Sequence, residues 1–112
     1  MSLTGRTRTV TPATPGTVED HGTVAGRAFG KGSIVLVGTF GGGRFTGSFR
    51  LTFPRGSVIG TTSMPFAFSG NEISFHGTSR FTGGTGAYRG ISSGPLDTRD
   101  HNTLDGQSGR LS

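Results

Sequence analysis

Residues 81–94 read Phe-Thr-Gly-Gly-Thr-Gly-Ala-Tyr-Arg-Gly-Ile-Ser-Ser-Gly, and five of these fourteen positions are glycine. Glycine is favoured where the backbone needs a positive φ angle or where another backbone approaches closely. Phe81 precedes the glycines, and Tyr88 and Ile91 lie within and after them. The simplest prediction is therefore a strand, a tight glycine turn and a second strand.

A glycine-rich loop also suggests phosphate binding, but the surrounding sequence argues against it. Phosphate-binding glycine motifs lie between a strand and a helix, so that the helix N-terminus meets the phosphate. No helical period follows Gly94, and no Gly-Lys-Ser/Thr occurs after the glycines. These glycines therefore indicate a backbone shape.

The segments before this run alternate between apolar and polar residues, as half-buried strands do. In residues 44–53 the phenylalanines occupy one face, and Arg, Thr and Ser occupy the other. Residues 57–68 and 72–82 follow the same pattern. Residues 33–40 are apolar on both faces, which is typical of a strand covered by a partner. Beyond the glycine run we predict short strands at 88–92 and 94–98, a polar loop at 99–103, and a closing strand at 104–111.

Seven to eight short strands joined by glycine turns, without a helical segment, predict an all-β protein. Four glycines fall in mid-strand on the face that carries the phenylalanines: Gly38, Gly47, Gly60 and Gly77. Interior glycines permit sharp coiling, and they leave space that neighbouring rings or a ligand fill. The sequence therefore predicts a small antiparallel closed β-barrel of seven to eight strands.

The first residues lack this alternation and are rich in Thr, Arg and Pro. We therefore predict a flexible N-terminal arm over residues 1–16, disordered or loosely attached, and a single β-barrel domain over residues 17–112. A chain of 112 residues is long enough for one domain, and its nine phenylalanines supply large apolar areas for a core.

Composition and charge exclude several function classes. The absence of cysteine excludes disulfides and thiolate metal sites. No apolar run approaches the roughly 20 residues of a membrane span, and no signal sequence is evident, so we expect a cytoplasmic protein. The net charge of +5 attracts anions, but the arginines are scattered along the chain. Because the phenylalanines alternate inward, they do not form stacking platforms for bases, and we do not expect nucleic-acid binding.

The segment Gly-Gly-Thr-Gly-Ala-Tyr-Arg-Gly at 83–90 resembles the signature of dirigent proteins. It resembles more closely the bacterial small barrels of the allene oxide cyclase-like group, in which Gly-Gly-Thr-Gly-x-Tyr-x-Gly recurs late in the chain. The resemblance extends loosely from Gly22 to Leu111 and includes Phe-Gly-Lys-Gly at 29–32. Residues 91–93 depart from the Ala-Arg-Gly-Tyr ending usual in plant dirigents, so the plant activity is not transferred.

This resemblance implies a small β-barrel that binds an apolar small molecule and steers its cyclisation or isomerisation by shape, without a cofactor or a metal. Six aromatic residues are the expected pocket lining: Phe40, Phe49, Phe66, Phe68, Phe75 and Tyr88. The ligand, the catalytic residues and whether any reaction occurs are left open. Two alternatives also stay open, namely a structural or interaction module with a filled barrel, and nucleic-acid binding. A different interpretation of Tyr88 is a packed aromatic that holds the glycine run in place.

Polar clusters offer weaker candidates. Residues 97–101 combine two aspartates with a histidine, but their spacing matches no metal-ligand motif, and we predict an exposed loop there. Alternate residues of 72–80 share one strand face that carries a glutamate, a histidine and an arginine. That face suits acid–base chemistry or a subunit interface, but we predict that it is the outer, hydrated face.

The sequence also predicts self-association. Val35, Val37 and Ile59 alternate out of phase with the phenylalanines, so they lie outside if the rings fill the interior. Exposed apolar patches usually mark interfaces, and closed symmetric assemblies are the usual result. We expect a homo-oligomer, either a dimer or a trimer. The competing prediction is that the N-terminal arm folds back over Val35 and Val37.

Overall fold

The computed structural model describes residues 3–11, 16–26, 29–70, 72–92, 96–103 and 109–111; of Asp97 and of residues 100–103 and 109–111 it describes the backbone alone. Within these ranges the chain is all-β apart from one short 3-10 segment, η1 (Gly86–Tyr88), between the sixth and seventh strands. The strands in chain order are β1 (Leu3–Val10), β2 (Val18–Gly26), β3 (Gly30–Gly41), β4 (Arg44–Phe53), β5 (Gly56–Ser69), β6 (Glu72–Gly84), β7 (Leu96–Thr103) and β8 (Gly109–Leu111).

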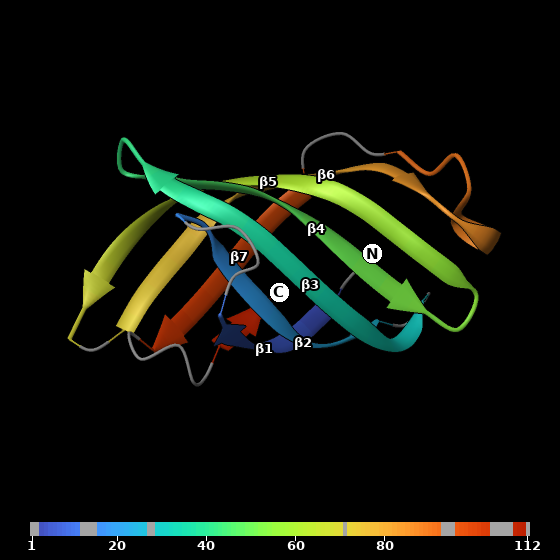
Figure 1. The fold of residues 1–112 in the computed structure, drawn as a ribbon, viewed down its shortest axis with the longest axis horizontal. Helices are drawn as coiled ribbons and strands as arrows, with labels where there is room; N and C mark the ends of the chain where they lie inside the picture. Colours follow the sequence, from blue (N-terminus) through green and yellow to red (C-terminus); the bar gives the residue numbers. More distant parts are fainter. Residues whose placement is uncertain are drawn as a thin grey trace.

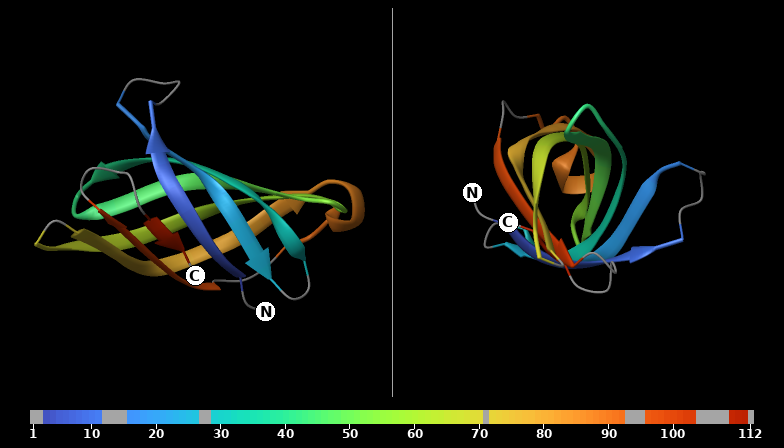
Figure 2. Two further views of the ribbon diagram at one scale, coloured as in Figure 1. Left: turned by 90° about the horizontal axis from the view of Figure 1, so that it is seen from below. Right: turned by 90° about the vertical axis from the view of Figure 1, so that its left-hand side faces the viewer.

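The sheet follows the order of the chain. Each strand from β1 to β7 pairs antiparallel with the next one along the sequence, and together they curve into a half-barrel (Figure 1). The hairpin of β1 and β2 leans outward from the rest of the wall (Figure 2, right). The three-residue strand β8 links the two sides of the opening, because it pairs with β1 over Gly5–Thr7 and with β7 over 100–102. The prediction of an antiparallel, barrel-like all-β fold is confirmed, but the seven strands β1 to β7 form an open half-barrel instead of the closed barrel predicted.

The strands form where the sequence alternates. In β4 the side chains of Phe45, Leu51 and Phe53 are buried, whereas Arg44 and Arg50 on the opposite face are exposed. The inner positions of β5 and β6 are filled in the same way by apolar side chains and small residues. Apolar burial at every second position is what fixes the register of such strands.

Several mid-strand glycines lie beneath aromatic rings. A Cβ atom on Gly60 would come within 2.5 Å of Cζ of Phe49, and one on Gly38 would come equally close to Cζ of Phe45. The backbone of the adjacent strand also lies too close to these glycines for a side chain. The rings therefore pack against the wall, and the prediction that phenylalanines fill the space left by Gly38 and Gly60 is confirmed.

The core has two parts, one toward each end of the barrel. One cluster comprises Val24, Phe29, Ile34, Leu51, Phe53, Val58 and Phe81. The other comprises Leu36, Phe45, Met64, Ile73 and Phe75. Phe49 is half-buried and packs against both clusters, so it joins them into one interior.

The prediction of a flexible arm over residues 1–16 is wrong for Leu3–Val10, which forms β1 and pairs with β2 along its whole length. Residues 12–15 lie outside the described part. The inner positions of β1 carry one leucine, a glycine and two threonines, so apolar alternation is nearly absent. Threonine is β-branched and suits a strand without supplying an apolar signal, which explains the error.

The glycine run also departs from its prediction. After Gly84 the chain does not form the strand predicted at 88–92 but turns through η1. The amide of Thr85 donates to the carbonyl of Ser57 (2.9 Å), and the amide of Ala87 donates to the carbonyl of Arg55 (2.9 Å), so the run is docked on the turn between β4 and β5. Gly56 and Gly86 have positive φ angles, and neither has room for a Cβ beside the facing backbone. The close approach of two backbones was therefore correctly predicted, although the element was not.

Near the end of the chain, the strands begin and end at other residues than those predicted from the sequence. The predicted polar loop at 99–103 is wrong, because these residues belong to β7. These residues are polar, so no apolar alternation indicated a strand there. Of the closing strand predicted at 104–111, Gly109–Leu111 forms β8, and 104–108 lie outside the described residues.

Candidate functional site

Five phenylalanines gather at the end of the barrel that carries the β3–β4 and β5–β6 turns, on the left in Figure 1. We call them the aromatic end: Phe40, Phe45, Phe66, Phe68 and Phe75. Ring centroids lie 5.1 Å apart for Phe40 and Phe45, 5.1 Å apart for Phe40 and Phe66, and 5.6 Å apart for Phe66 and Phe68. These separations are within the range of favourable aromatic pairs, so the rings form one continuous array over four strands.

The array runs from the core to the surface. Phe45 and Phe75 are buried and Phe66 is half-buried, whereas Phe40 is 46% exposed and Phe68 is 64% exposed. Exposed large apolar side chains that adjoin one another usually mark a surface that binds something. The aromatic end therefore presents a ring-lined surface that continues into the interior.

Most of the predicted pocket lining is found at this end. Phe40, Phe66, Phe68 and Phe75 lie together there, and their role as a pocket lining stays a prediction. Phe49 lies deeper, with its ring centroid 6.2 Å from that of Phe81. Phe45 belongs to the array but was not among the predicted lining residues, although it shares a strand face with Phe49.

Tyr88 lies at the opposite end of the barrel. It belongs to η1, which is seen across the far end in Figure 2 (right). Its ring packs on Phe29 (5.2 Å between centroids) and on Phe53 (6.0 Å). Tyr88 therefore does not line the aromatic end, and its packing agrees with the alternative interpretation as a residue that holds the glycine run in place. We call this region the capped end: Phe29, Phe53, Phe81, Tyr88 and η1.

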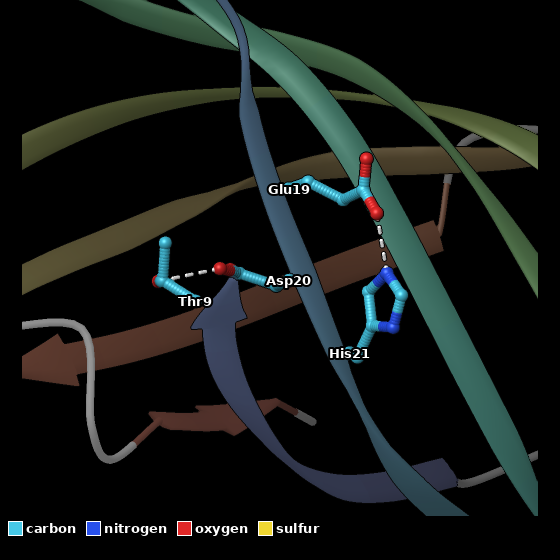
Figure 3. Close-up of polar contacts among 4 residues, drawn as sticks. All are labelled: Thr9, Glu19, Asp20 and His21. Atoms are coloured by element: carbon cyan, nitrogen blue, oxygen red, sulfur yellow. Dashed lines mark hydrogen bonds and ion pairs between the residues drawn. The ribbon is translucent and has the colours of Figure 1, made fainter. Parts of the chain in front are cut away.

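A buried carboxyl group lies on the inner face of β2. Asp20 is 3% exposed, and Oγ1 of Thr9 on the adjacent strand donates a hydrogen bond to its Oδ1 (2.6 Å; Figure 3). Burial raises the pKa of Asp20 above its ordinary value of 3.8, while the hydrogen bond from Thr9 and the nearby His21 act in the opposite direction. Asp20 was not among the candidate residues predicted from the sequence.

The neighbours of Asp20 along the strand point the other way. Nε2 of His21 lies 2.5 Å from Oε2 of Glu19, and this pair is on the outer face of β2, where His21 is exposed (Figure 3). Alternation along β2 therefore separates a solvated acid–base pair from the buried carboxyl of Asp20.

Hydroxyl groups form a second polar feature of the interior. Thr98 donates to Ser79 (2.8 Å), and Ser79 donates to Thr62 (2.9 Å), so a chain of hydroxyls crosses β7, β6 and β5. Thr62 and Ser79 are buried. The members satisfy one another, as buried polar groups normally do, so this chain stabilises the sheet.

The other polar candidates lie on the outer face or outside the described side chains. In β6, His76, Thr78 and Arg80 are exposed, as expected for a hydrated outer face. Asp97, Asp100 and His101 fall in β7, but their side chains lie outside the description. Among the side chains that are described, no group of three His, Asp or Glu residues is placed to hold a metal ion.

The apolar outer positions are less continuous than the sequence suggests. Val35 and Ile59 are exposed, but Arg50 lies between them in the ladder, paired with both. Residues 3–10 pair within the sheet and do not fold back over β3. Self-association through this face remains a prediction, which light scattering tests.

Comparisons with protein-family models, with curated proteins and with solved structures found no match. In the described part of the chain, no helix has the length and apolar character needed to cross a membrane.

Proposed function

We propose that the protein binds an apolar, flat small molecule at the aromatic end. One observation supports this above all: five phenylalanine rings form a continuous array that begins in the core and ends with Phe40 and Phe68 largely exposed. The same residues supply most of the pocket lining expected from the resemblance of residues 83–90 to allene oxide cyclase-like barrels.

The chemistry of the array favours a particular ligand shape. Phenyl rings offer faces and edges for stacked and edge-to-face contacts, so aromatic or polyene ligands gain more than branched aliphatic ones. Covering roughly 100 Å² of exposed ring surface contributes about 2.5 kcal/mol, at about 25 cal/mol per Å². This is a moderate contribution that suits reversible binding of a hydrophobic metabolite.

The resemblance extends the proposal from binding to steering. A ligand held between rings is restricted in conformation and shielded from water, and both effects favour one cyclisation or isomerisation outcome over others. Such a mechanism requires no cofactor, and its outcome depends on the shape of the array.

Binding is tested with 2-methoxynaphthalene, a neutral flat probe whose fluorescence responds to its environment. We expect saturable binding to the wild-type chain and about tenfold weaker binding to Phe68→Ser, because a ring contact of the order of 1.4 kcal/mol is lost. Ile59→Ser is the matched control, since it removes an exposed apolar side chain from the outer face. Equal affinities for the two variants contradict the proposal.

A filled barrel without a ligand is the second candidate function, as a structural or interaction module. It is favoured by the packing of Phe45 against Gly38 and of Phe49 against Gly60, because these rings occupy part of the interior. Absence of saturable binding by any flat apolar probe supports this candidate over the first. Nucleic-acid binding is a third, and retention on immobilised DNA that falls with salt is its test.

A further inference from the structure

Between the two core clusters, the inner faces of β1 and β2 carry three polar side chains: Thr7, Thr9 and Asp20. Thr7 is 6% exposed and Asp20 is 3% exposed. Thr9 donates to Asp20, but Oγ1 of Thr7 is buried and has no hydrogen-bond partner in the described part of the chain. Thr7 and Asp20 are diagonal neighbours, because Thr7 pairs with Gly22 and Thr9 pairs with Asp20 in the ladder.

Asp20 is the member of this group nearest the aromatic end, whereas Thr7 lies level with Ile34 of the other core cluster. Asp20 pairs with Leu36, which belongs to the same core cluster as Phe45 and Phe75, and Val18, two residues before Asp20, packs against that cluster. The next inner position of β3 is Gly38, which lies under the ring of Phe45. Asp20 is therefore roughly 5 Å across the sheet and about 7 Å along a strand from a position covered by an aromatic-end ring.

Folding alone does not account for this arrangement. A buried hydroxyl without a partner and a buried carboxyl group both oppose folding, because each loses hydration that the protein does not fully replace. An apolar residue at either position would avoid this cost. Buried polar groups without partners are expected where a ligand supplies the missing contact.

We propose that Thr7 and Asp20 form a polar subsite that binds a hydroxyl group of the ligand whose apolar part lies at the aromatic end. The inference rests on the proposed function and names the ligand class: a flat apolar alcohol or phenol. Asp20 receives or donates one hydrogen bond, Thr7 makes the other, and Thr9 holds the carboxyl group in place.

A hydroxyl group suits this pair better than a charged group does. It both donates and accepts, so it completes the contacts of Asp20 and Thr7 whether the carboxyl group is ionised or protonated. A ligand carboxylate cannot donate to Asp20, and it would meet like charge whenever Asp20 is ionised. A ligand ammonium cannot accept from Thr7, and its charge would be costly to bury here.

The subsite is tested with the matched probes 2-naphthol and 2-methoxynaphthalene at neutral pH, which differ by methylation of one oxygen. We expect the wild-type chain to bind 2-naphthol about tenfold more tightly, the effect of one well-formed hydrogen bond to a buried polar group. Thr7→Val and Asp20→Asn should each reduce this preference at least threefold. Thr61→Val, the same chemical change on the outer face, should keep the wild-type preference.

The outcomes separate the two proposals. If neither probe binds, the proposed function fails, and the subsite fails with it. If both bind with equal affinity, the aromatic end stands and the subsite is overturned. Tighter binding of 2-naphthoate or of 2-naphthylmethylammonium than of 2-naphthol also overturns the hydroxyl assignment. Circular dichroism shows whether each variant folds. If a variant does not fold, the preference of the wild-type chain for 2-naphthol over 2-methoxynaphthalene tests the subsite by itself.

Discussion

The two ends of this barrel are built from the same residue type and differ in what covers it. At the capped end, Phe29, Phe53 and Phe81 are buried, and η1 with Tyr88 packs against them. At the aromatic end, Phe40 and Phe68 stand largely exposed beyond Phe45 and Phe75. The capped end owes its cover to the glycine run docked on the β4–β5 turn, whereas the turns at the aromatic end are short. A phenylalanine therefore contributes to stability at one end and is available for binding at the other.

The largest expected effect is a difference in stability between substitutions at the two ends. Phe81→Ala removes a buried ring and should lower the free energy of unfolding by about 3–5 kcal/mol. Phe68→Ala removes a mostly exposed ring and should lower it by less than about 1 kcal/mol. Urea unfolding followed by circular dichroism measures both. If the two variants lose similar stability, the ends do not differ in the way that their burial indicates.

The second effect concerns the wall shared by the two ends. Gly60→Ala places a methyl group against the ring of Phe49 and the adjacent backbone, and it should cost about 1–3 kcal/mol of unfolding free energy. Gly41→Ala is the control, because no atom lies within 4 Å of the added Cβ, and a change within about 0.5 kcal/mol is expected. An unaffected Gly60→Ala variant would show that Phe49 is free to move away from the wall.

A third, smaller effect has the opposite sign. The hydroxyl group of Tyr88 is buried and has no hydrogen-bond partner among the described residues, so Tyr88→Phe should raise the free energy of unfolding by about 1 kcal/mol. The gain arises because an unsatisfied polar group leaves the capped end while the ring stays. Thermal unfolding measures it, and a fall in melting temperature would reveal a contact of this hydroxyl group that stabilises the fold.

The smallest effect depends on pH and concerns the buried carboxyl group of Asp20. Because burial raises the pKa of Asp20, the folded protein holds this proton more tightly than the unfolded chain. The stability contributed by this site is therefore present below the ordinary value of 3.8 and is lost as the pH rises through the folded pKa. Asp20→Asn lacks this titration, so its stability relative to wild type should increase over the same interval. A difference that does not change with pH contradicts the raised pKa.

The sequence predicted the fold where alternation was strong and failed where it was weak. Strands β3 to β6 carry phenylalanine, leucine or isoleucine at alternate positions, so their existence and inner faces were predictable. Strand β1 is rich in Thr and Arg, strand β7 is rich in Asp and Thr, and the strand character of both comes from pairing with neighbours. Local residue patterns carry no information about such partners, which is why β1 was predicted as an arm and part of β7 as a loop.

The aromatic residues of the candidate site could be predicted from the sequence, but its polar residues could not. Membership of one strand face identified Phe40, Phe66, Phe68 and Phe75, although not which end of the barrel each occupies. Tyr88 was misplaced because the turn through η1 depends on the β4–β5 backbone, which is distant in sequence. The cluster of Asp20 with Thr9 depends on the pairing of β1 with β2, and that pairing had no signal in the sequence.

The three-residue strand β8 has a consequence for the order of folding events. Every other ladder joins strands that are neighbours in the chain, so each can form over a short loop. The pairing of Gly5–Thr7 with β8 alone brings the two ends of the chain together, and it has only three residue pairs to offset a long closure. We expect this seam to form last and to open first, so that the amides of β8 exchange with solvent well before those of β4 and β5. Opening there would expose the backbone of Gly5–Thr7 to solvent while the rest of the wall stays paired.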